Sequence, residues 1–224
     1  MRGLYALKPW YTRRLGAVVR GAVRRGLSPD LFTALGVLAA AATGVAIGLG
    51  WWHVAAILLA GRLAGANLDG AVARAQGASR PWGFVLNELG DRSSDVLMFL
   101  GLAVLAHRTG HELIGPEWFP GDPLAWTLLA MAAAMLPTVA SLAVAGAGGP
   151  RLNGGPLGKT ERCLVVVVAT AFPATIPIAG ALVVIGSLVT SVTRLTRSRR
   201  ALLAADAVPA PPDADAPSDR EPRR

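Results

Sequence analysis

The chain has 224 residues, of which 53% are hydrophobic and only 16% are charged. This balance is too apolar for an ordinary soluble domain and favours an integral membrane protein. The formal net charge of +8 would also suit a nucleic-acid-binding protein, but the arginines cluster just outside apolar segments, where they would meet anionic lipid headgroups. We therefore expect membrane lipids, and no nucleic acid, among its partners.

The N-terminal segment combines basic and apolar side chains. Residues 4–25 alternate positions such as Leu15 and Val18 with arginines such as Arg13 and Arg20. This pattern predicts an amphipathic helix that lies in the headgroup plane, and it is too long and too charged for a cleaved signal peptide. We assign residues 1–27 to this cytoplasmic interfacial segment.

A long helix is expected to begin at about Pro29. Ser28 is a typical N-cap residue, proline is tolerated in the first turn, and the carboxylate of Asp30 suits the positive end of a helix dipole. From there the apolar stretches predict an all-α polytopic bundle of six transmembrane helices. The six candidate spans are roughly residues 31–50, 54–74, 83–106, 124–146, 162–177 and 179–195.

Arginine and lysine are dense before the first span, between spans two and three, between spans four and five, and after span six. The positive-inside rule therefore predicts that both termini are cytoplasmic. Lys8 and Lys159 are the only lysines among 22 basic residues, an arginine bias typical of GC-rich bacterial genomes, so we expect a bacterial inner membrane. Residues 28–198 form the predicted membrane domain, and residues 199–224 are predicted to be a disordered cytoplasmic tail.

Ionisable side chains inside the predicted spans indicate a functional site, because charge at membrane depth is costly. In span two, Arg62 and Asp69 are seven residues apart and share a helical face. Arg62 is therefore a candidate partner for Asp69.

Span three carries an acidic face. Asn87, Asp91 and Asp95 recur at i, i+4 and i+8, and Glu88 joins the last two at i, i+3 and i+7. Carboxylates this close repel one another or take up protons unless a cation lies among them. Oxygen ligands of this kind suit Mg²⁺ or Mn²⁺.

A purely structural interpretation competes with the metal site. Arg62 and Arg92 could neutralise Asp69 and either Asp91 or Asp95 as ion pairs between helices. The residues alone leave both interpretations open.

The end of span two and the start of span three match the pattern D-x2-D-G-x2-A-R-x8-G-x3-D-x3-D without gaps. The matching residues are Asp69-Gly70, Ala73-Arg74, Gly83 and Asp91. In this pattern the chain resembles the CDP-alcohol phosphatidyltransferase family, and the segments 28–33 and 155–162 also look like that family. The resemblance covers about residues 5–197.

The resemblance implies a reaction and a set of roles. A phosphatidyl group would pass from a CDP-lipid such as CDP-diacylglycerol to an alcohol acceptor, with release of CMP, in phospholipid biosynthesis. Asp69 would be a ligand of Mg²⁺ or Mn²⁺ and Asp91 the general base with possible metal contact. The residues expected to contact the donor nucleotide are Gly70, Ala73, Arg74 and Gly83.

The resemblance to the family implies two further properties. Lys159 and Arg162 would bind a phosphorylated acceptor, although ordinary positive-inside charge also explains them. The family's habit of pairing through its spans implies a homodimer.

The sequence departs from the family pattern at two of its four aspartates, which hold a two-metal site in the family. The first aspartate is replaced by Ala66 and the third by Asn87. Asn87, Glu88 and Asp95 are candidate replacement ligands. Two alternatives therefore stay open: a non-catalytic relative that binds CDP-lipid or acts as a membrane interaction protein, and a small transporter, against which the gapless motif counts.

Overall fold

The computed structural model describes residues 15–78, 80–109, 121–152 and 154–206. Every regular element in these ranges is a helix, which confirms the predicted all-α class. The elements are α2 (Gly16–Arg24), α3 (Pro29–Gly48), α4 (Trp52–Ala75), α5 (Pro81–Thr109), α6 (Pro123–Gly146), α7 (Lys159–Ala171), the short 3₁₀ helix η2 (Pro173–Thr175) and α8 (Ile176–Asp206).

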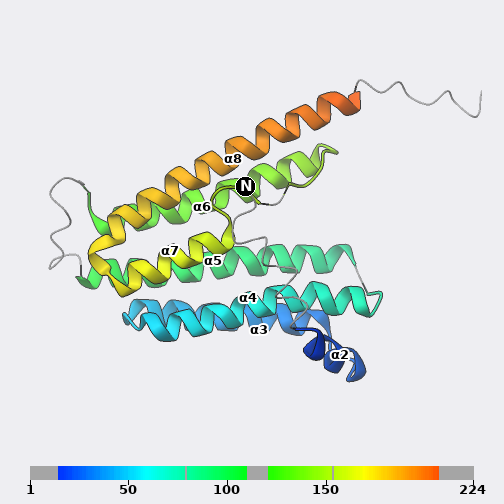
Figure 1. The fold of residues 1–224 in the computed structure, drawn as a ribbon, viewed down its shortest axis with the longest axis horizontal. Helices are drawn as coiled ribbons and strands as arrows, with labels where there is room; N and C mark the ends of the chain where they lie inside the picture. The colour runs from blue at the N-terminus through cyan, green and yellow to red at the C-terminus, as the bar shows by residue number, and fades with distance from the viewer. Residues whose placement is uncertain (1–14, 79, 110–120, 153, 207–224) are drawn as a thin grey trace, which may run out of the picture.

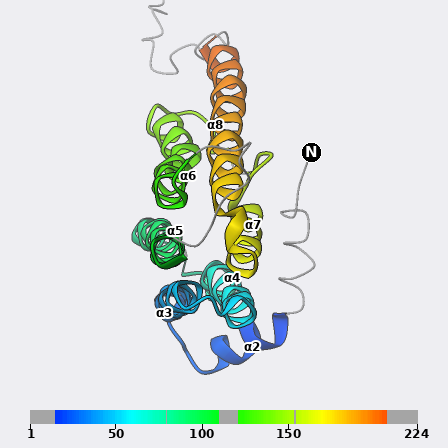
Figure 2. The same ribbon diagram turned by 90° about the vertical axis from the view of Figure 1, so that its left-hand side faces the viewer.

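The six longer helices run side by side along one direction (Figure 1). Seen end-on, α3 and α4 form one side of the bundle, α6 and α8 form the opposite side, and α5 and α7 lie between them (Figure 2). The short helix α2 lies across one end, beside α3 and α4. This arrangement puts the charged parts of α4, α5 and α7 in the interior of the bundle.

In the part of the chain that the structure describes, four helices are long and apolar enough to cross a membrane. They cover Pro29–Gly48, Trp52–Ala75, Pro123–Gly146 and Pro173–Leu203. Helix α5 is long enough but carries many charged residues, and α7 has 13 residues, a rise of about 20 Å against a hydrocarbon layer of about 30 Å. The chain is therefore a helical membrane protein, in which four of the six predicted spans meet these criteria.

Helix α3 begins where its capping residues predict. Ser28 is the N-cap, and its Oγ accepts a hydrogen bond of 3.3 Å from the amide of Asp30. At the other end of the chain, α7 ends at Ala171, earlier than predicted, because Pro173 opens a 3₁₀ turn there.

Helix α8 continues to Asp206, so the prediction of disorder is wrong for residues 199–206. Residues 201–205 read Ala-Leu-Leu-Ala-Ala, which are strong helix formers that prolong a helix already begun. The remainder of the predicted tail, residues 207–224, lies outside the described residues.

Helix α2 docks its apolar face on the rest of the chain. Ala22 is buried against Phe32, Leu68 and Val72, while arginines on the other face are exposed. This confirms an amphipathic helix over the described part of the segment 1–27; residues 1–14 lie outside the described residues.

Helices α3 and α5 touch backbone to backbone where they cross. A Cβ atom added to Gly101 would lie 2.1 Å from the carbonyl oxygen of Gly44, and one added to Gly44 would lie 2.5 Å from the carbonyl oxygen of Leu97. Neither carbonyl can retreat without bending its helix. Small residues are therefore required at this crossing, as is common between membrane helices.

We expect Gly101→Ala to lower the free energy of unfolding by about 1–3 kcal/mol, because the added methyl group collides with a backbone atom. Gly61→Ala is the matched control, since a Cβ there meets no heavy atom within 4 Å. The unfolding midpoints of both variants in detergent micelles provide the test. Equal midpoints for Gly101→Ala and the wild type would contradict the tight crossing.

Candidate active site

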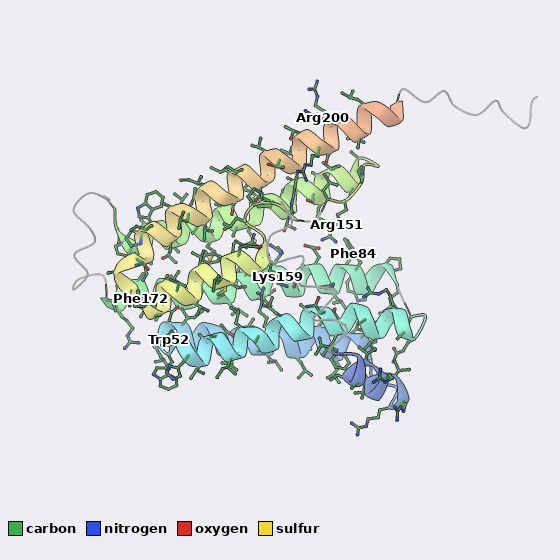
Figure 3. The ribbon with its side chains drawn as sticks, viewed as in Figure 1. Trp52, Phe84, Arg151, Lys159, Phe172 and Arg200 are labelled. Atoms are coloured by element: carbon green, nitrogen blue, oxygen red, sulfur yellow. The ribbon has the colours of Figure 1, made fainter. Side chains whose placement is uncertain are left out.

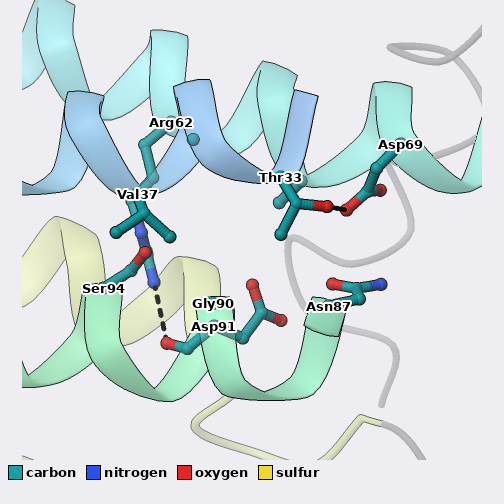
Figure 4. A pocket seen from close by; sticks show the side chains of 10 residues that line it. Thr33, Val37, Arg62, Asp69, Asn87, Gly90, Asp91 and Ser94 are labelled. Carbon is teal, nitrogen blue, oxygen red and sulfur yellow. Dashed lines mark hydrogen bonds between the residues drawn. The ribbon is translucent and has the colours of Figure 1, made fainter. Parts of the chain in front are cut away.

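A small, partly open cleft lies among α3, α4 and α5. In the close-up of Figure 4, Asn87 and Asp91 on α5 lie opposite Thr33 and Asp69. Arg62 and Ala66 also line the cleft. The cleft thus brings together Asp69 and Asp91, which match the family pattern. It also includes Ala66 and Asn87, which replace the other two aspartates of that pattern.

The carboxylate of Asp69 is almost completely buried, with 5% of the residue exposed. Its Oδ2 accepts a hydrogen bond of 2.9 Å from the hydroxyl of Thr33, and its Oδ1 accepts one from the amide of Gly70. The prediction that Arg62 pairs with Asp69 is wrong, because the guanidinium of Arg62 extends instead to Asp95 on α5.

Asp95 has no exposed surface and is surrounded by guanidinium groups. Its Oδ1 lies 2.7 Å from Nη2 of Arg62, and its Oδ2 lies 2.9 Å from Nη2 of Arg162 and 3.1 Å from Nη1 of Arg92. The ion-pair interpretation is therefore confirmed for Asp95, which connects α4, α5 and α7. Arg62 also donates to Sγ of Cys163, 3.2 Å away on α7.

Asp91 and Lys159 are in direct contact. The Lys159 ammonium donates to Oδ1 of Asp91, so the predicted general base and a predicted acceptor-binding cation lie side by side. Both side chains are partly exposed, at 27% and 21%. Lys159 is the first residue of α7 and follows the connector that leads from α6.

Glu88, one of the candidate replacement ligands, lies on α5 outside the lining of the cleft. Its Oε2 accepts a hydrogen bond from Arg151, and its Oε1 lies 3.8 Å from Nε of Arg92. Asp95 does not line the cleft either. Among the candidate replacement ligands, Asn87 is the one that faces the cleft.

Gly70, Ala73, Arg74 and Gly83, the predicted donor-binding residues, lie near the cleft but not in its lining. A Cβ added to Gly83 would meet nothing closer than the side chain of Arg80 at 3.5 Å, and one added to Gly70 would meet the guanidinium of Arg74 at 3.2 Å. Packing within the chain therefore does not explain why these two positions are glycine.

A second charged region, the cation cluster, lies beside Asp91 and consists of Arg92, Arg151, Lys159, Arg162 and Arg194. Arg92, Arg151 and Arg162 lie within electrostatic reach of Arg194. Among the described residues, Nε of Arg151 and Nε of Arg162 are buried and have no hydrogen-bond partner. Unsatisfied cationic donors of this kind suit an anion.

The sequence indicates Lys159 and Arg162 as acceptor-binding residues but does not indicate that Arg151 and Arg194 join them. The distribution of basic residues around the predicted spans explains Arg151 and Arg194 as topogenic charges, since each follows the end of a predicted span or lies near it. No pattern within one helix could reveal them, because the cluster assembles from α5, α7, α8 and the connector.

The cleft offers a small set of hard oxygen donors: the carboxylates of Asp69 and Asp91, the amide of Asn87 and the hydroxyl of Thr33. Within the described ranges, no three His, Cys, Asp or Glu residues are grouped as a metal centre, so Asp69 and Asp91 need further oxygen ligands to complete a coordination sphere. This donor chemistry fits a hard divalent cation.

Known proteins resemble the chain over most of its length. The family model for CDP-alcohol phosphatidyltransferase matches residues 27–193. A phosphatidylinositol phosphate synthase of Mycolicibacterium smegmatis is 30% identical in an alignment of 196 residues, and the match covers 83% of each chain. A protein of the same name from Streptomyces avermitilis is 28% identical over 222 residues, covering 91% of this chain and 85% of the relative.

Solved structures of a Mycobacterium tuberculosis phosphatidylinositol phosphate synthase have the same fold. The form with CDP-DAG bound has a TM-score of 0.70 at 25% identity and covers 88% of this chain and 100% of that one. The complex with manganese and citrate has a TM-score of 0.67 at 25% identity, with 89% and 95% covered. The chain belongs to the CDP-alcohol phosphatidyltransferase family, whose enzymes transfer a phosphatidyl group from a CDP-lipid to an alcohol.

Proposed function

We propose that this enzyme uses CDP-diacylglycerol as donor and a phosphorylated alcohol, of the inositol phosphate type, as acceptor. The cation cluster carries this proposal, because Lys159 contacts Asp91 and the Nε atoms of Arg151 and Arg162 have no hydrogen-bond partner in the described part of the chain, an arrangement that suits a phosphate group. The relatives named phosphatidylinositol phosphate synthase support the same acceptor class. The solved relative with CDP-DAG bound supports the donor.

Asp69, Asn87 and Asp91 are the residues that would hold a divalent cation, Mg²⁺ or Mn²⁺. When bound there, the cation supplies positive charge that offsets the diphosphate of the donor. Gly70, Ala73, Arg74 and Gly83 lie outside the lining of the cleft, on the same two helices as Asp69 and Asp91, and we assign them to the donor nucleotide, with Arg74 as a phosphate contact. Two carboxylates and an amide give fewer charges than the four aspartates of the family pattern.

The contact between Lys159 and Asp91 suggests how acceptor binding prepares the reaction. A phosphate that binds Lys159 competes with Asp91 for the same ammonium group. Once released, the Asp91 carboxylate takes the proton from the acceptor hydroxyl while that oxygen attacks the phosphorus that carries the lipid. The bond from this phosphorus to the CMP oxygen breaks, and CMP leaves.

The membrane arrangement is proposed from the distribution of charge. Trp52 and Phe172 lie toward one end of the bundle, and Arg151 and Arg200 lie toward the other (Figure 3). Aromatic residues are common at membrane interfaces, and arginine is enriched on the cytoplasmic side. We therefore propose a bacterial inner-membrane protein with six spans, cytoplasmic termini, an interfacial α2 and a homodimeric assembly.

We expect purified protein with CDP-diacylglycerol and Mg²⁺ or Mn²⁺ to release CMP when inositol phosphate or glycerol phosphate is added, but not with inositol or glycerol. Asp91→Asn should lower the rate by about a hundredfold or more, because it removes the general base. Asp30→Asn, which opens an exposed ion pair with Arg80, is the matched control.

Equal CMP release with the unphosphorylated alcohols would contradict the proposed acceptor class. Absence of release from folded protein that still binds CDP-lipid would favour the non-catalytic alternative instead. An active relative assayed in parallel establishes that the substrates and lipids are competent.

We propose that Asp95 is an internal counter-ion for three arginines and not a metal ligand. Asp95→Asn should lower the free energy of unfolding on the order of 3–5 kcal/mol, because buried guanidinium groups lose their compensating charge. Asp69→Asn should cost less stability but abolish Mn²⁺ binding. A stable Asp95→Asn variant that has lost Mn²⁺ binding would contradict this assignment; unfolding in detergent and Mn²⁺ titration distinguish the two.

A further inference from the structure

The described parts of the connector between α6 and α7, residues 147–152 and 154–158, are held by both sides of the bundle. On the side of α6 and α8, Ser141 Oγ donates to the carbonyl of Leu152 at 2.8 Å and Arg194 Nε donates to the carbonyl of Gly154 at 2.9 Å. On the side of α5, the connector is held through Arg151. The connector therefore spans the region in which the cation cluster lies.

Two side chains of α5, one helical turn apart, fix the guanidinium of Arg151. Its Cζ lies 4.7 Å from the centre of the Phe84 ring, and its Nη2 donates to Oε2 of Glu88. Figure 3 shows Phe84 and Arg151 next to each other where α5 approaches the connector. A ring face and a carboxylate together restrict both the position and the tilt of a planar guanidinium.

Without a carboxylate beside it, Arg151 would be repelled from this position. Arg92 lies on the other side of Glu88, with its Nε 3.8 Å from Oε1, and Arg162 and Arg194 complete the cationic surroundings. Like charges in a partly desolvated region repel strongly. Glu88 is 15% exposed in its side chain and supplies the negative charge that keeps Arg151 among them.

We propose that Glu88 is a positioning residue for the acceptor phosphate, which acts by holding Arg151 in place, and that it is not a metal ligand. This inference rests on the proposed function, in which the cation cluster binds a phosphorylated acceptor. Both carboxylate oxygens of Glu88 face guanidinium groups, and Glu88 does not line the cleft that holds Asp69, Asn87 and Asp91. The side chain of Arg151 remains 31% exposed, and its Nε has no hydrogen-bond partner among the residues that the structure describes.

The test is Glu88→Gln, which keeps the size of the side chain and removes its charge. The KM for inositol phosphate is expected to rise about tenfold, the scale of a lost charge-assisted hydrogen bond. The KM for CDP-diacylglycerol and the Mn²⁺ affinity measured by electron paramagnetic resonance should both remain unchanged. Glu88→Asp, which keeps the charge, should restore part of the acceptor affinity.

Further variants separate positioning from loss of structure. Phe84→Leu removes the ring that contacts the Arg151 guanidinium. It should raise the KM for inositol phosphate a few-fold and leave the Mn²⁺ affinity unchanged. If Glu88→Gln does not fold, Phe84→Leu replaces it as the test variant. Asp30→Asn opens the exposed pair with Arg80 and should leave the acceptor KM unchanged. Asp69→Asn is the positive control for loss of Mn²⁺.

The outcomes that overturn the proposal are distinct from failure of the proposed function. If Glu88→Gln weakens Mn²⁺ binding and leaves the acceptor KM unchanged, Glu88 is a metal ligand and the inference is wrong. If neither quantity changes while the wild type uses inositol phosphate, only this inference fails. If the wild type turns over no phosphorylated alcohol, the proposed acceptor and this inference fail together.

Discussion

The interior of this bundle depends on the ion pairs that the buried carboxylate of Asp95 makes with three arginines. This carboxylate balances guanidinium groups from α4, from α5 itself and from α7, at 2.7, 3.1 and 2.9 Å. Charges in a membrane domain are tolerated when they compensate one another. With Asp95 in place, α7 stays against α4 and α5, and its first residue, Lys159, reaches Asp91. Along α5, residues that line the cleft thus alternate with charges that pair inside the bundle.

That alternation explains which parts of the site could be predicted. Gapless motif spacing located Asp69 and Asp91, and both line the cleft. Helical periodicity also placed Glu88 and Asp95 near that face, but it could not reveal which charges they meet. Their partners Arg151 and Arg162 are distant in sequence, at separations of 63 and 67 residues. Only the packing of the helices decides whether an acidic residue faces a cation from the solvent or an arginine.

The positions of most helices could likewise be predicted from the sequence. Capping at Ser28 and long apolar stretches located the helices, because these signals are local. The last helices were harder, since α7 is short and a proline-rich turn separates it from α8. The end of α8 was misjudged for a different reason: a change in composition after Arg200 indicated disorder, yet the alanines and leucines that follow continue a helix already begun.

The contact between Gly44 and Gly101 has a consequence for how the enzyme accommodates its substrates. Thr33 and Gly90, at the cleft, each lie eleven residues from that contact, a rise of about 16 Å along their helices. Since α3 and α5 already touch there, backbone against backbone, the two helices cannot approach further at that crossing. A change in the separation of α3 and α5 at the cleft therefore requires one helix to bend, or to pivot about the contact between Gly44 and Gly101, and not a parallel approach of the pair.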